Sequence, residues 1–201
     1  MGTRLSAALC GLSFQLLGCS YSAEQIPVGT PDDYDIRGAV TAVAVGANPI
    51  ITLDESERYL GDDVTEKLLP IFIVVDNQSD EVKLIERAEA LLSSSDGAAL
   101  RPITAKRAVS TFLFSVSDAS AVGGPVGNDL ARTANSDMTT DWTRKELPAS
   151  VMLRQGRKTA GVLFFSRPPG SGPLKLKVSL LGMKSNRTDE IELEIPRPAR
   201  G

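Results

Sequence analysis

Apolar and polar residues alternate along two segments near the end of the chain, 174–180 and 191–195. Because successive side chains of a β-strand point to opposite faces, each segment is predicted to form a strand with one buried and one solvent-exposed face. The polar positions are basic in the first segment and acidic in the second: Lys175, Lys177, Glu192 and Glu194. Opposite charges on facing positions stabilise an antiparallel pair, so we expect these strands to be neighbours in that register.

Two other segments, 71–75 and 162–165, are apolar without interruption. Such strands are typical of a sheet that is covered on both faces, so an extra layer is expected on at least one side of it. Turn-forming residues at 46–49, 77–80, 96–97 and 155–156 separate shorter β-prone runs at 40–45, 50–53, 82–84, 91–92 and 151–153. A helical turn over 86–92 is an open alternative to a strand there.

Between residues 104 and 147 the apolar positions recur with a helical period. In the first half they are Ala105, Ala108, Val109, Phe112, Leu113, Val116 and Ala119, and Thr104 is suited to cap this helix. In the second half they are Leu130, Ala134, Met138 and Trp142. The glycine-rich segment 122–127 separates them, so a helical hairpin is predicted, with Trp142 in the core. A strand over 110–117, where Phe112, Phe114 and Val116 alternate, is the alternative.

These elements predict a mainly β fold with some helix, an antiparallel β-sandwich over 36–198 that carries a helical hairpin insertion at about 104–147. The segments 68–79 and 156–165, together with Ser95-Asp96-Gly97, resemble an immunoglobulin-like, telokin-like domain family that is common in bacterial lipoproteins. The resemblance implies an immunoglobulin-like sandwich. It covers about half of the mature chain and implies no particular activity, because the family has none generally assigned. The long helical insertion departs from the simplest form of the family.

The first 18 residues are predicted to be a signal peptide. Arg4 precedes an apolar stretch over 5–17, which is within the range of an export signal and too short to span a bilayer. The stretch ends in Leu-Leu-Gly-Cys at 16–19, which resembles the lipobox of bacterial lipoproteins. The resemblance implies that a peptidase cuts before Cys19 and that the Cys19 thiol receives the lipid. The residue after it is Ser20 rather than Asp, which by the same resemblance favours the outer membrane facing the periplasm.

Ordinary secretory cleavage and the absence of processing are the alternatives. A secretory cut needs small residues at the −3 and −1 positions, whereas a cut after Ala23 places Tyr21 at −3. Residues 19–35 contain prolines, glycines and aspartates without apolar periodicity, so they are predicted to be a flexible tether. A coil of this length has a root-mean-square reach of roughly 20 to 24 Å. The tether would therefore let the domain stand clear of the lipid headgroups.

The charged and chemically reactive residues narrow the function further. The whole chain has a net charge of −3, and removal of residues 1–18 takes away Arg4, which leaves 21 basic and 25 acidic residues. This mild acidity argues against a nucleic-acid partner. Both cysteines, Cys10 and Cys19, lie in the first 19 residues, and the chain has no histidine. The folded part therefore has no thiol nucleophile, disulfide or His-ligated metal, and we expect no catalytic, metal-binding or cofactor-binding residue.

Three local patterns suggest chemistry without having the required spacing. The acid-rich segment 54–66 lacks the spacing and loop glycine of an EF-hand, so a solvated connection is predicted instead of a calcium site. The glycines at 123–127 lack the Gly-Lys-Ser/Thr of a phosphate-binding loop, and a hinge explains them better. The adjacent acids Asp62-Asp63 and Asp189-Glu190 would point apart on a strand. Asn77 and Asn186 match glycosylation sequons by coincidence.

These observations favour a non-enzymatic binding or structural module of the envelope, held to the membrane by lipid on Cys19. Its expected partner is another envelope protein or a glycan. The main alternative is a carrier or chaperone for an apolar ligand, in which the hinge over 123–127 lets the helical pair lift from the sheet. The second alternative is an enzyme that depends on neither histidine nor cysteine.

Overall fold

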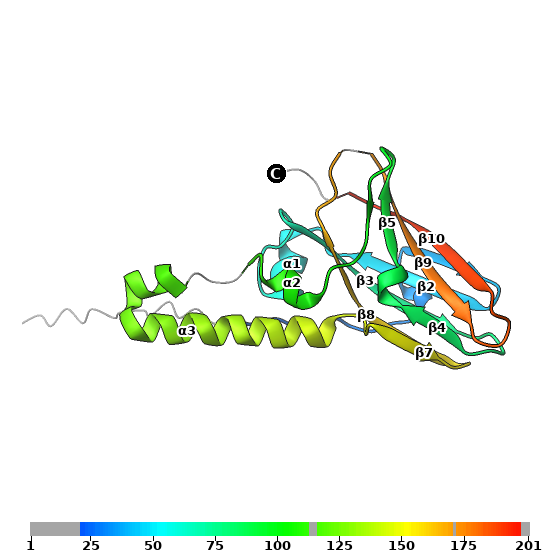
Figure 1. The fold of residues 1–201 in the computed structure, drawn as a ribbon, viewed down its shortest axis with the longest axis horizontal. Helices are drawn as coiled ribbons and strands as arrows, with labels where there is room; N and C mark the ends of the chain where they lie inside the picture. The colour runs from blue at the N-terminus through cyan, green and yellow to red at the C-terminus, as the bar shows by residue number, and fades with distance from the viewer. Residues whose placement is uncertain (1–20, 113–115, 171, 198–201) are drawn as a thin grey trace, which may run out of the picture.

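The computed structural model describes residues 21–112, 116–170 and 172–197, with 116–127 described by their backbone alone. Two antiparallel sheets face each other (Figure 1). The first sheet has the order β1 (Ile36–Val40), β2 (Val43–Pro49), β3 (Leu68–Asn77), β8 (Arg157–Ser166). The second has the order β6 (Ala99–Leu100), β5 (Leu91–Ser94), β9 (Leu174–Gly182), β4 (Lys83–Glu86), β7 (Ser150–Leu153), and β10 (Thr188–Ile195) also pairs with β9. The predicted β-sandwich character is confirmed.

The side chains between the two sheets form the main hydrophobic core. β9 and β10 alternate between buried and more exposed positions, as their sequences predicted. Their register places Glu192 opposite Lys177 and Glu194 opposite Lys175, which confirms the predicted antiparallel pair. The ion pairs themselves run diagonally, from Lys177 to Glu190 at 2.9 Å and from Lys175 to Glu192 at 3.6 Å.

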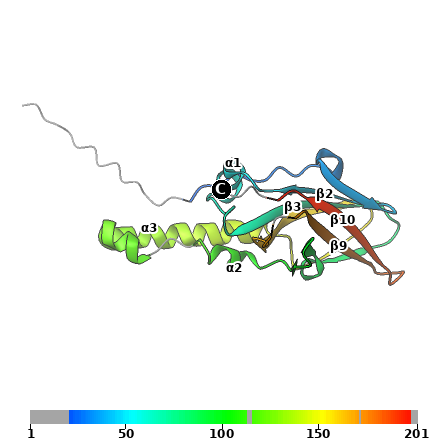
Figure 2. The same ribbon diagram turned by 90° about the horizontal axis from the view of Figure 1, so that it is seen from above.

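A third layer packs on the outer face of the first sheet. It consists of α1 (Leu53–Leu60), α2 (Ala105–Val109), part of α3 (Val116–Lys145) and the segment 21–35, which includes the 3-10 turn η1 (Pro31–Asp33). Figure 2 shows its helices α1 and α2 near the end of β3, where α3 extends away from the sandwich. Their apolar side chains pack on Phe72 and Val74 of β3 and on Phe164 of β8. This layer explains why β3 is buried on both faces, as its uninterrupted apolar sequence predicted. Each fully buried large side chain contributes roughly 1.5 to 3 kcal/mol.

The two helices between β6 and β7 differ from the predicted hairpin. Thr104 caps α2 as expected, because its side chain accepts a hydrogen bond from the Arg107 amide. However, α2 ends at Val109, and the backbone of α3 runs as helix through the glycines at 123–127, where the break was predicted. The early end has a local cause. The hydroxyls of Ser110 and Thr111 bond to the carbonyls of Arg107 and Ala108, and such bonds compete with helix continuation.

Residues 46–60 also differ from their predicted structure. Residues 46–49 were expected to form a turn, but they continue β2, because Gly46 and Asn48 pair with Val74 and Phe72 of β3. The predicted strand at 50–53 is absent and α1 begins at Leu53. Thr52 and Glu55 form the start of this helix: the Thr52 hydroxyl accepts from the Glu55 amide at 3.3 Å and donates to its carboxylate at 3.0 Å. The predicted solvated connection over 54–66 thus begins as a helix.

The remaining connections agree with the turn signals. Asp96-Gly97 joins β5 and β6, and Gly97 has a φ of 87°. The 3-10 turn η2 (Arg87–Glu89) separates β4 from β5, which both pair with β9. The edge of β8 that does not pair with β3 is covered by the segments just before α2 and just after α3. The amides of Ile103 and Leu147 in these segments donate hydrogen bonds to carbonyls of β8. Within the described residues, no helix has the length and apolar character needed to cross a bilayer.

Candidate functional site

The predicted lipidation residue Cys19 and the predicted signal peptide 1–18 lie outside the described residues. Tyr21 is the first described residue, and its side chain packs on the domain. Its ring lies against Gly61, the left-handed residue that ends α1 with a φ of 73°. A Cβ on Gly61 would lie 2.5 Å from Cε2 of Tyr21, so only glycine leaves room for the ring in this position.

Asp141 of α3 anchors the Tyr21 hydroxyl. The hydroxyl donates to Oδ2 of Asp141 at 2.5 Å. The same carboxylate accepts from Lys145 Nζ at 2.6 Å and from Arg144 at 3.1 Å. Lys145 also donates to the Tyr59 carbonyl in α1 at 2.6 Å, so both ends of this buried ion pair have partners. Burial of the phenol and its bond to the Asp141 carboxylate raise the pKa of Tyr21, which therefore stays protonated and remains a donor.

Trp142 fixes α3 on the sheet next to this cluster. The side chain is fully buried and its indole nitrogen donates to the Leu60 carbonyl at 2.9 Å. The indole stacks on Phe164 of β8, with ring centroids 5.2 Å apart. The prediction that Trp142 is a core residue is confirmed.

Residues 21–35 differ from the predicted flexible tether. The Glu24 amide donates to the Arg58 carbonyl at 2.7 Å, and the Glu24 carboxylate pairs with the Arg58 side chain. Ile26 packs in the layer over the first sheet, and the Tyr34 ring lies 6.2 Å from that of Phe72. The physical reason is that the apolar side chains of this segment cover the outer face of β3, which would otherwise be exposed. Together, residues 21–26 with α1 and Asp141 form what we call the N-terminal clamp.

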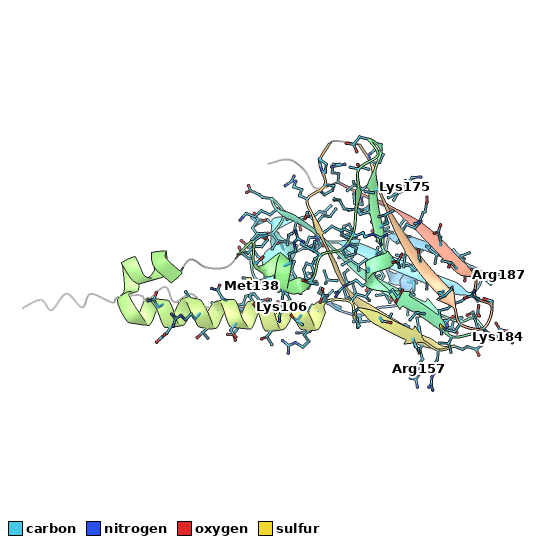
Figure 3. The ribbon with its side chains drawn as sticks, in the orientation of Figure 1. Lys106, Met138, Arg157, Lys175, Lys184 and Arg187 are labelled. Carbon is cyan, nitrogen blue, oxygen red and sulfur yellow. The ribbon has the colours of Figure 1, made fainter. Side chains whose placement is uncertain are left out.

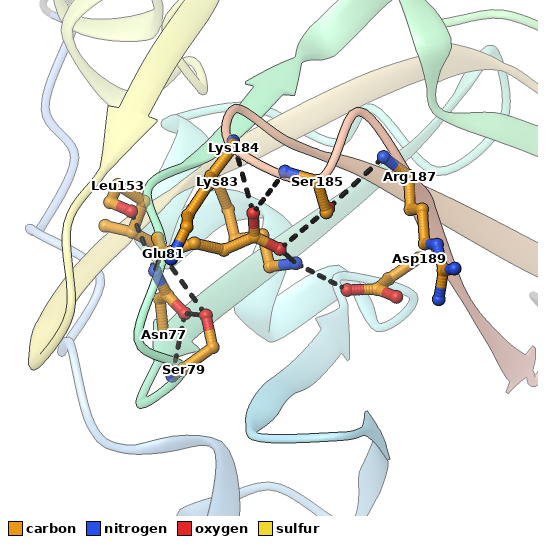
Figure 4. Close-up of polar contacts among 9 residues, drawn as sticks. All are labelled: Asn77, Ser79, Glu81, Lys83, Leu153, Lys184, Ser185, Arg187 and Asp189. Carbon is orange, nitrogen blue, oxygen red and sulfur yellow. Dashed lines mark hydrogen bonds and ion pairs between the residues drawn. The ribbon is translucent and has the colours of Figure 1, made fainter.

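A second polar cluster lies where the β3–β4 and β9–β10 connections meet (Figure 4). Lys83 Nζ, which is almost fully buried, donates to Glu81 at 2.7 Å and to Asp189 at 2.8 Å. Glu81 in turn accepts from the backbone amides of Lys184 and Ser185 and from the Ser185 hydroxyl. The cluster thus joins two connections that are about 100 residues apart in the chain.

The charges of this cluster hold each other in place. Hydrogen bonds from Lys83 and Ser185 lower the pKa of Glu81 to about 2. Burial alone would lower the pKa of Lys83, but its bonds to Asp189 and Glu81 raise it above the ordinary value. A lysine that stays charged is a poor base or nucleophile. The geometry therefore favours a structural ion-pair network over proton transfer.

Ser79 and Lys83 do not form a Ser-Lys catalytic pair. The Ser79 hydroxyl donates to Asn77 Oδ1 at 2.6 Å, whereas Lys83 is engaged with the two carboxylates. Asn77 is fully buried, and its amide donates to the carbonyls of Glu81 and Leu153. The Asn77 side chain of this sequon is therefore not accessible in the folded domain.

The other acidic patterns do not converge on a site. Asp189 pairs with Lys83 and Glu190 with Lys177, so this adjacent pair is divided between opposite faces of β10. Asp62 accepts from the Asp63 amide, and Asp63 accepts from Thr65. Across the part of the chain that the structure describes, no three His, Cys, Asp or Glu residues are grouped so as to hold a metal ion.

Sequence reasoning missed both polar clusters. The only sequence signal for the clamp is the Asp141–Lys145 spacing, which places an acid and a base one helical turn apart. Tyr21 has no such signal, because its partner is 120 positions away. Lys83 has one partner two positions away, Glu81, but Asp189, which completes the network, is 106 positions away. Lys83 lies between apolar residues of a strand, where a buried cation is not expected without knowledge of its partners.

Comparisons with known proteins add little to this geometry. Neither a protein-family model nor a curated protein matches the chain. Among solved structures, the chain is similar to the crystal structure of the yjhA protein from Bacillus subtilis, with 10% sequence identity and a TM-score of 0.40. That similarity covers 78% of this chain and 95% of the other. A likeness of this strength carries no argument about function.

Proposed function

We propose that the protein is a lipid-anchored module of the bacterial cell envelope that acts by binding a partner. In this proposal the acyl chains are on Cys19 and the domain faces the periplasm from the outer membrane. The observation that carries it is the sequence Leu16-Leu17-Gly18-Cys19, which resembles a lipobox and follows an apolar export-like stretch. Two acyl chains suffice for stable anchoring.

The test is acylation of Cys19 in cells. Cys19→Ser is expected to abolish incorporation of radiolabelled palmitate and to move the protein from the membrane fraction to the soluble fraction. Ser20→Ala is the matched control and should change neither. Retention of the Cys19→Ser variant in the membrane fraction would contradict the proposal. Ser20→Asp tests which of the two membranes holds the protein, because we expect this variant to stay in the inner membrane.

The proposed binding surface is the end of the sandwich that lies opposite α3. Figure 3 shows Arg157, Lys184 and Arg187 together at this end. They are exposed, as is Arg154, and none of the four forms an ion pair with another described residue. A basic cluster on an otherwise acidic protein attracts anionic groups at short range. The partner we propose is therefore an envelope component that presents carboxylates or phosphates.

A charge-reversal variant tests this surface. Arg157→Glu with Arg187→Glu should lose at least tenfold of the partner recovered by crosslinking and pull-down from membranes. The matched control is Arg101→Glu with Lys175→Glu, which reverses two exposed bases on another surface. Treatment of the membranes with protease or with glycan-degrading enzymes before the pull-down distinguishes a protein partner from a glycan. Unchanged recovery with the first variant would remove this surface from the proposal.

We also propose that the sandwich is immunoglobulin-like. The support comes from the strand pairing. β2, β3 and β8 pair in the order that strands A, B and E have in such domains, and β4, β9 and β10 pair in the order of C, F and G. On this assignment β7 pairs with strand C, which is β4. The segment that contains α2 and α3 is inserted in the chain before β7. An experimental structure with a different connection between the two sheets would contradict the assignment.

A further inference from the structure

We propose that the C-terminal end of α1 and the Asp137–Arg144 part of α3 face the lipid bilayer, so that the domain stands on the membrane in a fixed orientation. The inference rests on the proposed acylation of Cys19 and goes beyond it by assigning the membrane-facing surface. Consecutive Cα atoms are about 3.8 Å apart, so the Cα of Tyr21 lies within about 7.6 Å of that of Cys19. Whatever surrounds Tyr21 is therefore held close to the headgroups.

The N-terminal clamp prevents rotation about this short connection. Tyr21 is bonded to Asp141 of α3, Glu24 is bonded through its backbone to Arg58 of α1, and Ile26 is packed in the layer over the first sheet. Three attachments that do not lie on one element resist rotation, whereas a coil of six residues would reach roughly 12 to 15 Å and turn freely. The orientation is thus determined by folding of residues 21–26 and does not need a further membrane contact.

The surface around the clamp suits contact with headgroups. A shallow hollow of about 350 Å³ is lined by Tyr21, Ser22, Ala23, Gln25, Asp137, Thr140, Asp141 and Arg144. Its exposed residues are polar and carry both charges, with the Arg144 side chain 65% exposed. The large exposed apolar side chains of the described residues, such as Leu53 and Met152, do not line it. We therefore assign headgroup contact without insertion into the hydrocarbon.

The basic end of the sandwich lies away from the clamp. Arg157, Lys184 and Arg187 lie at the end opposite α3 (Figure 3). A freely tethered domain would bring these bases down onto anionic lipid, because basic groups near an anionic surface gain about 1 kcal/mol each. The clamp keeps them available for a partner on the far side. A clamped domain and a freely tethered domain hold these basic residues at different distances from the membrane, and this difference can be measured.

The experiment uses the acylated protein in vesicles of phosphatidylethanolamine and phosphatidylglycerol that contain a headgroup spin label. The mature chain has no cysteine other than Cys19, which acylation consumes, so one introduced cysteine takes a fluorophore specifically. Thr140→Cys places the fluorophore beside the clamp and Gln155→Cys places it in the exposed β7–β8 turn. We expect quenching at position 140 to exceed that at position 155 at least threefold. Equal quenching at the two positions overturns the inference.

A linker variant shows whether the clamp sets the orientation. Sixteen glycine and serine residues inserted between Ser20 and Tyr21 leave every clamp contact intact but separate the domain from the lipid. The quenching difference should then disappear, and its persistence would also overturn the inference. Palmitate incorporation is measured on the same samples. Its absence contradicts the proposed function, whereas incorporation with equal quenching contradicts the orientation alone.

Discussion

The hydroxyl of Tyr21 lies 2.5 Å from Oδ2 of Asp141, although 120 positions separate the two residues in the chain. The contact joins the N-terminal part of the described chain to α3. Because Asp141 is also held by Lys145, and Lys145 by the Tyr59 carbonyl, the acceptor is positioned before Tyr21 binds. The segment after the predicted lipid anchor is thus a structural part of the domain, and its removal should have a measurable cost.

Tyr21→Phe should lower the free energy of unfolding by about 1 to 2 kcal/mol, because it deletes one hydrogen bond to a charged acceptor and keeps the ring. Urea denaturation at neutral pH measures the change. Tyr34→Phe is the matched control: its hydroxyl makes only longer bonds, to the Gly29 amide at 3.2 Å and the Pro27 carbonyl at 3.3 Å. We expect a smaller loss there. Equal effects of the two variants would argue against the clamp.

Gly61→Ala should be more destabilising than Gly97→Ala. Both glycines have positive φ angles, 73° and 87°, so both alanines bear a backbone cost of about 1 to 2 kcal/mol. Only at position 61 would the new Cβ also meet Tyr21, at 2.5 Å, whereas nothing lies within 4 Å of it at position 97. Displacement of the ring should add about 1 kcal/mol or more. The difference between the two variants in thermal and urea unfolding measures this added cost.

Lys83→Met should destabilise the domain by about 3 to 5 kcal/mol, because it leaves Glu81 and Asp189 without their shared buried cation. Adding Asp189→Asn should recover part of the loss, since it neutralises one of the two carboxylates. The control is Lys175→Met, whose ion pair with Glu192 is more than half exposed and should contribute less than about 1 kcal/mol. A Lys83 variant as stable as the Lys175 variant would show that the network is not structural.

Acid should weaken the domain through Glu81. The pKa of this carboxyl is about 2 in the folded protein, against an ordinary value of 4.5. A depressed folded-state pKa contributes stability that is fully present above pH 4.5 and is lost as the pH falls towards 2. Urea denaturation at a series of pH values should therefore show a decline over this window. Glu81→Gln should be less stable at neutral pH and should flatten the decline; an unchanged slope would contradict this assignment.

Local patterns in the sequence predicted much of the sandwich. The alternation in β9 and β10 predicted their faces and register, and the uninterrupted apolar run in β3 predicted a sheet covered on both sides. Thr104 and Trp142 were also placed correctly, as a helix cap and a core residue. Each of these predictions depends on residues a few positions apart, whose side chains share a face by backbone geometry alone.

The errors arose where local preference competed with a distant partner. Residues 46–49 favour a turn by composition, but pairing with β3 satisfies their backbone and extends β2. The apolar residues of 21–35 follow no period, although Tyr21, Ile26 and Tyr34 pack in the layer over the first sheet, so the sequence predicted a coil. In α3 the backbone stays helical through glycines that favour a break, and the helix boundary lies instead where Ser110 and Thr111 bond to their own backbone.

The sequence by itself determined which residues could be buried in strands, and it determined the chemistry that is missing: the chain has no histidine, and both of its cysteines lie in the first 19 residues. Only the tertiary structure decided where the charged and hydroxyl groups find partners. Lys83 is stable in the interior because the distant Asp189 joins the neighbouring Glu81 at its ammonium group, and Tyr21 is bound because α3 brings Asp141 to it. Such pairings depend on distances in space, which local periodicity does not encode.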